Sequence, residues 1–202
     1  MKRMVRTAIL LAVALSLSVS GSAQESKQPG TAPKSQAAVD KALDLAMTPG
    51  AGQQRLNAMV GSFDIKIKTW VYPDQPPVES SATCVATWVL GNRYVQMVID
   101  GTENEDPFKG IGYFGFDNTT NTYQATWMDN GSTGMYWYTG GLDSSGKRAT
   151  MKTSVISPLT GKPSPLEMRV TIDEQGDHVT ELWGTGLGTK MFKLMELRYT
   201  KK

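Results

Sequence analysis

Cysteine and histidine are almost missing from this chain. Its 202 residues include one cysteine, Cys84, and one histidine, His178. A single cysteine excludes an intramolecular disulfide, so the folded state has to be stabilised by a buried core. A single histidine excludes a metal site with two imidazole ligands, and any serine, histidine and aspartate triad would depend on His178. We therefore predict no metal site, no cofactor and no catalytic residue, and we expect Cys84 to be a buried thiol on a strand.

Long apolar runs are also missing. The longest mainly apolar stretch, Ala8–Val19, spans a dozen residues, whereas a membrane-spanning helix needs about 20. Basic residues at positions 2, 3 and 6 precede this stretch and the small residues 20–23 follow it, which is the pattern of a secretory signal peptide. We expect cleavage after Ala23, export to the periplasm or out of the cell, and a soluble mature protein without a membrane span.

Strong charge of one sign is a further absence. The formal net charge is +2, and residues 1–23 hold three basic and no acidic side chains, so the remainder carries −1. That remainder has no cluster of Lys and Arg, and it therefore lacks the electrostatic footprint of a nucleic-acid-binding protein. We expect no nucleic acid partner, and the sequence points to no particular protein partner.

The N-terminal part beyond the signal peptide is predicted to contain a linker and two short helices. Residues 24–35 combine Pro, Gly, Ser and charge without a large apolar side chain, which favours a flexible tether. From Gln36, apolar side chains recur at helical spacing until Pro49-Gly50 stops the run. A second short helical segment is predicted at 53–60, ahead of Gly61. Both are too short to be stable alone, so we expect both to pack on something, and the sequence leaves open whether they cap the barrel or dock a partner.

From Ser62 onward, apolar side chains recur at every second residue. Phe63, Ile65 and Ile67 alternate with charged residues, as in a strand with one wet face. Similar runs lie near 80–90, 93–101, 108–116, 122–129, 133–140, 147–156, 165–173, 178–184 and 190–200, with turn residues between them. No helix between these runs is long enough to connect two parallel strands, so neighbouring strands should be antiparallel. An open sheet would leave its edge strands exposed, and closure into a barrel removes these edges. We predict an all-β fold in which residues 36–202 form one domain, a closed antiparallel meander β-barrel of about 8–10 strands, with the short helical segment at 36–60.

The two ends of the predicted barrel resemble the lipocalin and calycin plan. A short helix precedes Gly61-Ser62-Phe63, and Arg198 lies near the end of the last strand. In that plan an aromatic ring, usually tryptophan, plugs one barrel end two residues after a glycine, and a basic side chain of the final strand lies across it. The resemblance implies that Gly61, Phe63 and Arg198 close the barrel, with the guanidinium stacked on the ring.

Five segments, in their order and combination, resemble the bacterial domain-of-unknown-function family 1579. They are Leu56–Phe63, Trp88–Tyr94, Gly110–Asn118, Tyr123–Asp129 and Pro158–Lys162. The resemblance covers roughly Pro49–Lys201. It implies a calycin-type barrel of unassigned function and supplies no catalytic residues.

Aromatic and methionine side chains point most clearly to a function. All five tryptophans fall on predicted strands, and a barrel of this size is either filled by such rings or encloses one small ligand. We predict that the barrel binds a small, mostly apolar ligand; a packed, non-catalytic structural or interaction module is the alternative. Arg93 and Asp129 share strand parity with large apolar residues, so they orient a ligand, pair with each other or reach the rim. The candidate ligand-binding residues are Trp88, Arg93, Met97, Phe114, Trp127, Asp129 and Trp137.

Two chemical alternatives stay open. His178 follows a turn at a strand start and is a candidate haem ligand as well as an ordinary turn histidine. Asp129, Glu181 and Glu196 would suit a glycosidase if two of them converged, so an uncharacterised enzyme is the third hypothesis.

One glycine motif matches a cofactor fingerprint without its structural context. Gly110-Ile-Gly-Tyr-Phe-Gly115 fits the dinucleotide pattern, but a turn and a strand follow it instead of the required helix. We interpret these glycines as sites of bending or close approach that could leave hollow space inside the barrel.

Overall fold

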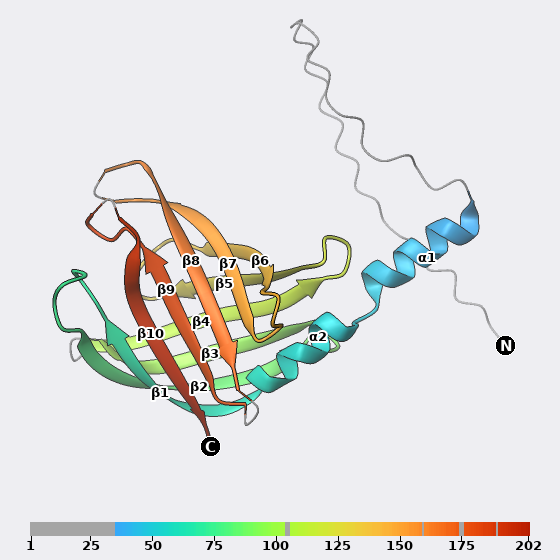
Figure 1. Cartoon of the computed structure of the whole chain (residues 1–202). Coiled ribbons are helices and arrows are strands. Elements are labelled where there is room, and N and C mark those ends of the chain that lie inside the picture. Colours follow the sequence, from blue (N-terminus) through green and yellow to red (C-terminus); the bar gives the residue numbers. More distant parts are fainter. Residues whose placement is uncertain (1–34, 104–105, 159, 174–175, 189) are drawn as a thin grey trace, which may run out of the picture.

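The two-residue periodicity produces ten strands in the described residues, and these wrap into a closed barrel (Figure 1). The computed structural model describes residues 35–103, 106–158, 160–173, 176–188 and 190–202. The strands are β1 Gly61–Thr69, β2 Val78–Val89, β3 Tyr94–Glu103, β4 Asp106–Asp117, β5 Thr122–Asp129, β6 Tyr136–Leu142, β7 Arg148–Ile156, β8 Pro163–Ile172, β9 His178–Gly184 and β10 Phe192–Lys201. They are preceded by helix α1 Gln36–Met47, helix α2 Ala51–Arg55 and the 3-10 helix η1 Leu56–Met59.

Every strand pairs antiparallel with its neighbours in sequence, and β1 pairs with β10 to close the barrel. The closing pair runs from Phe63 opposite Lys201 to Thr69 opposite Met195. The other side of β1 pairs with β2, where Phe63 lies opposite Cys84. Closure satisfies the backbone groups that an open sheet would expose at its edges. The predicted closed antiparallel meander barrel is confirmed.

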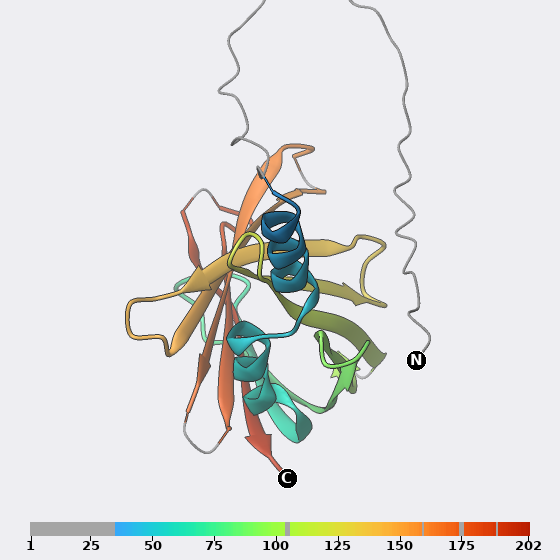
Figure 2. The same cartoon turned by 90° about the vertical axis from the view of Figure 1, so that its right-hand side faces the viewer.

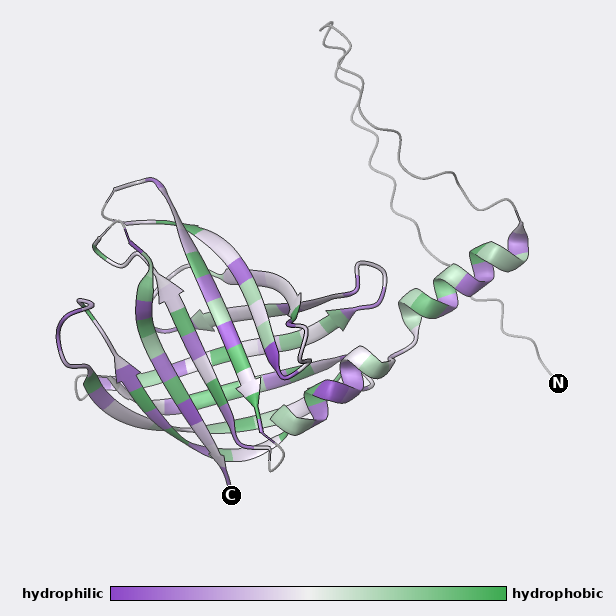
Figure 3. Cartoon of the chain, viewed as in Figure 1, coloured by the Kyte–Doolittle hydropathy of each residue, from purple (hydrophilic) through white to green (hydrophobic). Residues whose placement is uncertain are grey.

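Alternate side chains of each strand point into the barrel, and the hydropathy of the chain follows this alternation (Figure 3). On β1, Phe63 and Ile65 are buried, whereas Asp64 and Lys66 are exposed. Cys84 on β2 is buried, as predicted, and its burial raises the pKa of the thiol to about 12. The thiol therefore stays protonated at neutral pH, which disfavours nucleophilic chemistry at this position.

The segment formed by α2 and η1 packs against one end of the barrel (Figure 2). Gln53 of α2 is buried, and its Nε2 donates to the carbonyl of Phe116 at 2.7 Å. Gly52 permits this close approach, since a Cβ at that position would come within 2.1 Å of the Phe116 ring. Leu56 and Met59 of η1 are buried in the core. Of the two alternatives left open by the sequence, the structure shows this segment capping the barrel.

Helix α1 extends away from the barrel (Figure 1). The hydroxyl of Ser35 caps its N-terminus by accepting from the amide of Ala38. Side chains of Asn118 and Arg93 donate to three carbonyls at its C-terminal end. Within α1, all of which is described, no residue is buried. The attachment of α1 to the barrel consists of polar contacts to carbonyls that a helix end leaves unpaired, and its apolar face does not pack on the barrel.

The predicted signal peptide, residues 1–23, lies outside the described residues, and so does the predicted tether 24–35 apart from Ser35. In the described part of the chain, no helix has the length and apolar character needed to cross a membrane.

Candidate functional site

Three aromatic rings fill the barrel interior along β1, β9 and β10. Phe63 is fully buried, and its ring meets the ring of His178 edge-on with centroids 5.0 Å apart. His178 stacks on Tyr199 with centroids 4.1 Å apart and planes 13° apart. Cross-strand pairing accounts for the stack, because Tyr199 of β10 lies opposite His178 of β9. We call Phe63, His178 and Tyr199 the aromatic plug. Gly61 starts β1 beside it at a φ of 145°, a conformation that other residues rarely adopt.

Arg198 does not contribute to the aromatic plug. Its side chain is 60% exposed on the outer face of β10, and its Nε donates to Glu196 at 2.8 Å. Leu197 and Tyr199 on either side are buried, so strand alternation turns Arg198 outward. The lipocalin-plan expectation that Arg198 lies across Phe63 is therefore wrong, and His178 and Tyr199 cover that ring instead.

Trp127 occupies the space beside the glycines of β4. A Cβ at Gly110 would come within 2.2 Å of the indole, and a Cβ at Gly112 within 3.0 Å. The indole Nε1 donates to Oδ2 of Asp129 at 2.7 Å, while Oδ1 accepts from the amide of Gly131 at 3.0 Å. The interpretation of these glycines as sites of close approach is confirmed, but the space they leave holds an indole ring rather than a void.

His178 is a core residue. It is 2% exposed, its Nδ1 lies 3.5 Å from the Gly176 carbonyl oxygen, and its Nε2 has no hydrogen-bond partner in the described part of the chain. Burial lowers the pKa of His178 to about 4, against smaller opposing effects of Gly176, Asp177 and Asp173. Tyr199 and Phe63 contact the ring, and among the described residues His178 lines neither of the two cavities described below. The geometry thus gives no support to the haem-ligand hypothesis.

We expect the barrel to lose stability as the pH falls from about 6.5 to about 4. The pKa of His178 is about 4 in the folded protein, against 6.5 for the free side chain. Between these values the unfolded chain binds more protons, so the free energy of unfolding decreases by about 3 kcal/mol in all, and the contribution is complete above pH 6.5. Urea unfolding of the wild type and of His178→Phe at pH 7 and pH 4 measures this. The same pH dependence in both proteins would contradict the assignment.

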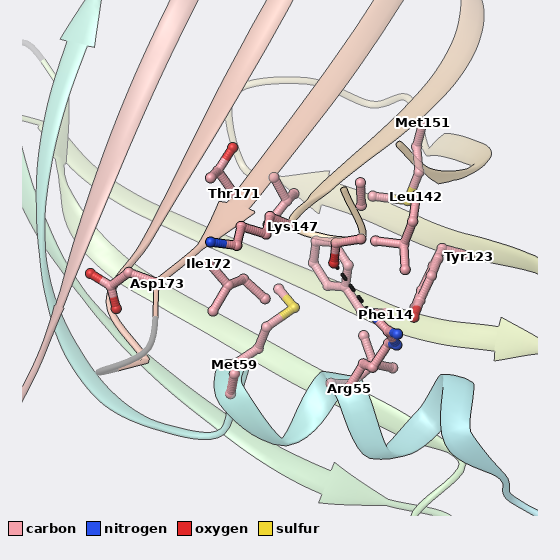
Figure 4. Close-up of a pocket in the computed structure, with 15 residues that line it drawn as sticks. Arg55, Met59, Phe114, Tyr123, Leu142, Lys147, Met151, Thr171, Ile172 and Asp173 are labelled. Carbon is pink, nitrogen blue, oxygen red and sulfur yellow. Dashed lines mark hydrogen bonds between the residues drawn. The ribbon is translucent and has the colours of Figure 1, made fainter. Parts of the chain in front are cut away.

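The hollow part of the interior lies between α2–η1 and the inner faces of β4, β5, β7 and β8 (Figure 4). Its volume is about 590 Å³, within the roughly 300–1,000 Å³ of small-molecule sites. Its walls are mainly apolar and include Leu56, Met59, Phe114, Met151, Val170 and Ile172. The barrel interior is therefore filled by aromatic rings along β1, β9 and β10. It is hollow beside α2–η1, along β4, β5, β7 and β8.

Charged and polar groups border this cavity in two places. Arg55 lies beside Tyr123, and its Nη1 donates to the Gly146 carbonyl at 3.2 Å (Figure 4). Lys147 and Asp173 lie on the other side of the cavity (Figure 4). Burial raises the pKa of Tyr123, and the charge of Arg55 opposes this shift. A guest in the cavity would therefore meet apolar walls and a polar rim.

The structure brings one of the predicted ligand-binding residues, Phe114, to the wall of this cavity. Met97 is buried in the core, and Trp88 packs on the core with its Nε1 donating to Asn57 at 2.9 Å. Trp127 and Asp129 are bound to each other along β5. Met97, Trp88 and Trp127 thus contribute to the core, and Asp129 at the end of β5 is partly buried; among the described residues none of the four lines the cavity.

Arg93 lies outside the barrel, in the turn before β3. The strand starts at Tyr94, so the strand parity used to place Arg93 inside does not extend to it. The guanidinium donates to the carbonyl of Met47 at 2.7 Å and to the carbonyls of Leu90 and Gly91, each at 3.3 Å. Arg93 therefore neither lines the cavity nor pairs with Asp129; it is an exposed residue beyond the strand that attaches α1 to the barrel.

Trp137 also lies outside the barrel. Its side chain is 57% exposed, whereas Tyr138 next to it is buried. It lines a groove of about 370 Å³ on the outer wall together with Leu90, Tyr94 and Tyr113. The prediction that Trp137 contacts a ligand inside the barrel is corrected, because strand alternation on β6 sends Tyr136 and Tyr138 inward instead.

The candidate glycosidase carboxylates do not meet in a cavity. Glu181 and Glu196 lie opposite each other on β9 and β10, where Lys193 forms ion pairs with both. Burial raises the pKa of Glu196, but Lys193 and Arg198 outweigh it and keep the pKa below its usual value. Asp129 lies apart from them at the end of β5, where it accepts hydrogen bonds from Trp127 and Gly131. The arrangement is a charge-paired outer wall rather than two carboxylates facing across a cleft.

Several residues of the cavity were not predicted from the sequence. Leu56 and Met59 could have been found, because they share one face of a short helix that has to pack. Met151 could also have been found, because it lies on the inward side of its strand. Arg55 and Lys147 carry no such signal, since they lie at a helix end and in a turn, where periodicity does not define a direction.

These features define a class: a lipocalin-like antiparallel barrel with a helical segment packed at one end and an apolar cavity beside it. A family model described as "Protein of unknown function (DUF1579)" matches residues 48–201, so the chain belongs to that family. The crystal structure of Rv2717c from M. tuberculosis is similar, with 14% identity, a TM-score of 0.56, and coverage of 77% of this chain and 99% of that chain. At that identity the likeness concerns the fold alone. No curated protein matches the chain.

Proposed function

We propose that this protein is an exported carrier or sensor that binds a small, mostly apolar molecule in the cavity between α2–η1 and the barrel wall. The observation that carries the proposal is the apolar cavity of about 590 Å³, whose walls come from strands far apart in sequence. Burial of apolar surface is the main source of affinity that such a site offers. The signal-peptide pattern of residues 1–23 supports export.

Filling the cavity is expected to weaken binding. Ala149→Phe places a ring among the cavity walls, and we expect at least about a tenfold loss of affinity for the neutral apolar probe N-phenyl-1-naphthylamine. A fluorescence titration measures this, and native mass spectrometry of gently purified protein tests for a retained guest.

Ile156→Phe is the matched control, because Ile156 lies on the same strand and is 64% exposed. It should bind the probe as the wild type does. No probe binding by the wild type, or equal binding by Ala149→Phe and the wild type, would contradict a guest in this cavity.

A non-catalytic interaction module is the second candidate. The supporting observation is the outer groove beside Trp137, where Leu90 and Tyr94 are also exposed. An exposed cluster of this kind suits a partner surface. The interior cavity favours the carrier, because a module that works through its outer wall needs no hollow interior.

A further inference from the structure

The cavity has an asymmetric rim. Arg55 and Tyr123 lie together on one side, whereas Lys147 and Asp173 lie on the other (Figure 4). The second side carries one charge of each sign, and the first carries a single positive charge. A guest that spans the cavity therefore meets an excess of one positive charge next to Tyr123.

The guanidinium of Arg55 is positioned but not neutralised. Its Nη1 donates to the Gly146 carbonyl at 3.2 Å, which orients the group over the cavity rim. Within the described part of the chain, Arg55 forms no ion pair. One hydrogen bond leaves most of its five N–H donors for another acceptor. A guanidinium presents these donors in a fork that matches a carboxylate.

Resting on the proposed function, we infer that the natural guest is an amphipathic carboxylate, with its apolar body in the cavity and its carboxylate at Arg55. The apolar walls select the body through surface burial. The rim selects the head group, because the exposed guanidinium of Arg55 offers a charge-assisted fork of donors to a carboxylate that stays at the cavity mouth in contact with water. The hydroxyl of Tyr123 lies beside Arg55 and donates to the Gly52 carbonyl at 3.4 Å, and it would exchange this long hydrogen bond for one to the carboxylate.

The test compares decanoate with decan-1-ol, which share an apolar chain and differ in head-group charge. Displacement of N-phenyl-1-naphthylamine gives the affinity of each. We expect the wild type to bind decanoate about tenfold more tightly than the alcohol at neutral pH. Arg55→Gln keeps a side-chain donor for Gly146 but removes the charge, and it should abolish this preference. Arg55→Lys keeps the charge and should retain most of it.

Lys147→Gln is the matched control, because it removes the same charge from the opposite side of the rim and should leave the preference nearly unchanged. Equal binding of acid and alcohol by the wild type would overturn the inference and leave the proposed function standing. Binding of neither ligand and no probe binding would overturn both. Equal weakening of acid and alcohol in Arg55→Gln would assign Arg55 a structural role only. If Lys147→Gln lost the preference for decanoate as fully as Arg55→Gln, the carboxylate would be attracted by the positive charge of the whole rim, and the inference of recognition at Arg55 would be overturned.

Discussion

Gly140→Ala is expected to destabilise the barrel by about 3 kcal/mol or more, a large fraction of the roughly 5–15 kcal/mol by which folded domains are stable. A Cβ at this position would stand 1.9 Å from the carbonyl oxygen of Thr150 and 2.7 Å from the Cα of Met151. Both are backbone atoms of β7, so a side-chain rotation cannot relieve the contact. Gly140 also lies opposite Tyr123 on β5, and a displaced β6 would therefore disturb pairing on both sides.

Gly141→Ala is the control for this prediction. A Cβ there meets nothing within 4 Å in the described structure, and the residue is exposed. We expect a change of about 0.5 kcal/mol or less, with a small gain possible because alanine loses less backbone entropy than glycine on folding. Urea unfolding of both variants measures the difference. Similar stabilities would show that β6 and β7 do not approach as closely as described.

Phe63→Ala is expected to lower the free energy of unfolding by about 3–5 kcal/mol. Phe63 is fully buried, and its ring contacts His178 and Tyr199, with centroids 5.0 Å and 6.1 Å away. Truncation removes the transfer free energy of the ring and leaves a cavity inside the aromatic plug. The loss of two edge-to-face contacts adds to this cost. Thermal and urea unfolding provide the measurement.

Arg198→Ala distinguishes the observed plug from the closure that the lipocalin plan implies. Arg198 is on the outer wall with its side chain 60% exposed, and its buried partner Glu196 keeps the ion pair with Lys193 in the variant. The loss should therefore be close to the roughly 0.2–1 kcal/mol of a solvent-exposed ion pair. We therefore expect a much smaller loss than for Phe63→Ala. A loss as large as that of Phe63→Ala would restore the stacked arginine and remove His178 from its assigned role.

The candidate site could be predicted only in part. Phe114 lines the cavity because it lies well inside a strand, where alternation defines the inner face. Arg93 was misplaced because it stands one residue before its strand, where alternation no longer applies. The size and aromaticity of Trp137 suggest a residue of the interior, yet the two tyrosines beside it occupy the inner face of β6. Composition indicates an aromatic interior but does not say which rings enter it.

The sequence by itself determines where the strands lie, their antiparallel order, the closure of the barrel and its core of inward apolar residues. These properties depend on local patterns, because the alternation along each strand and the turn residues between strands can be recognised in short stretches of sequence. The filled and hollow parts of the interior were decided only by the tertiary structure. Trp127 reaches the glycines of β4, His178 reaches Phe63, and Arg55 reaches the cavity rim because closure sets these distant segments side by side. Such contacts depend on strand register and on how closely backbones approach, and neither is encoded in the periodicity of any single segment.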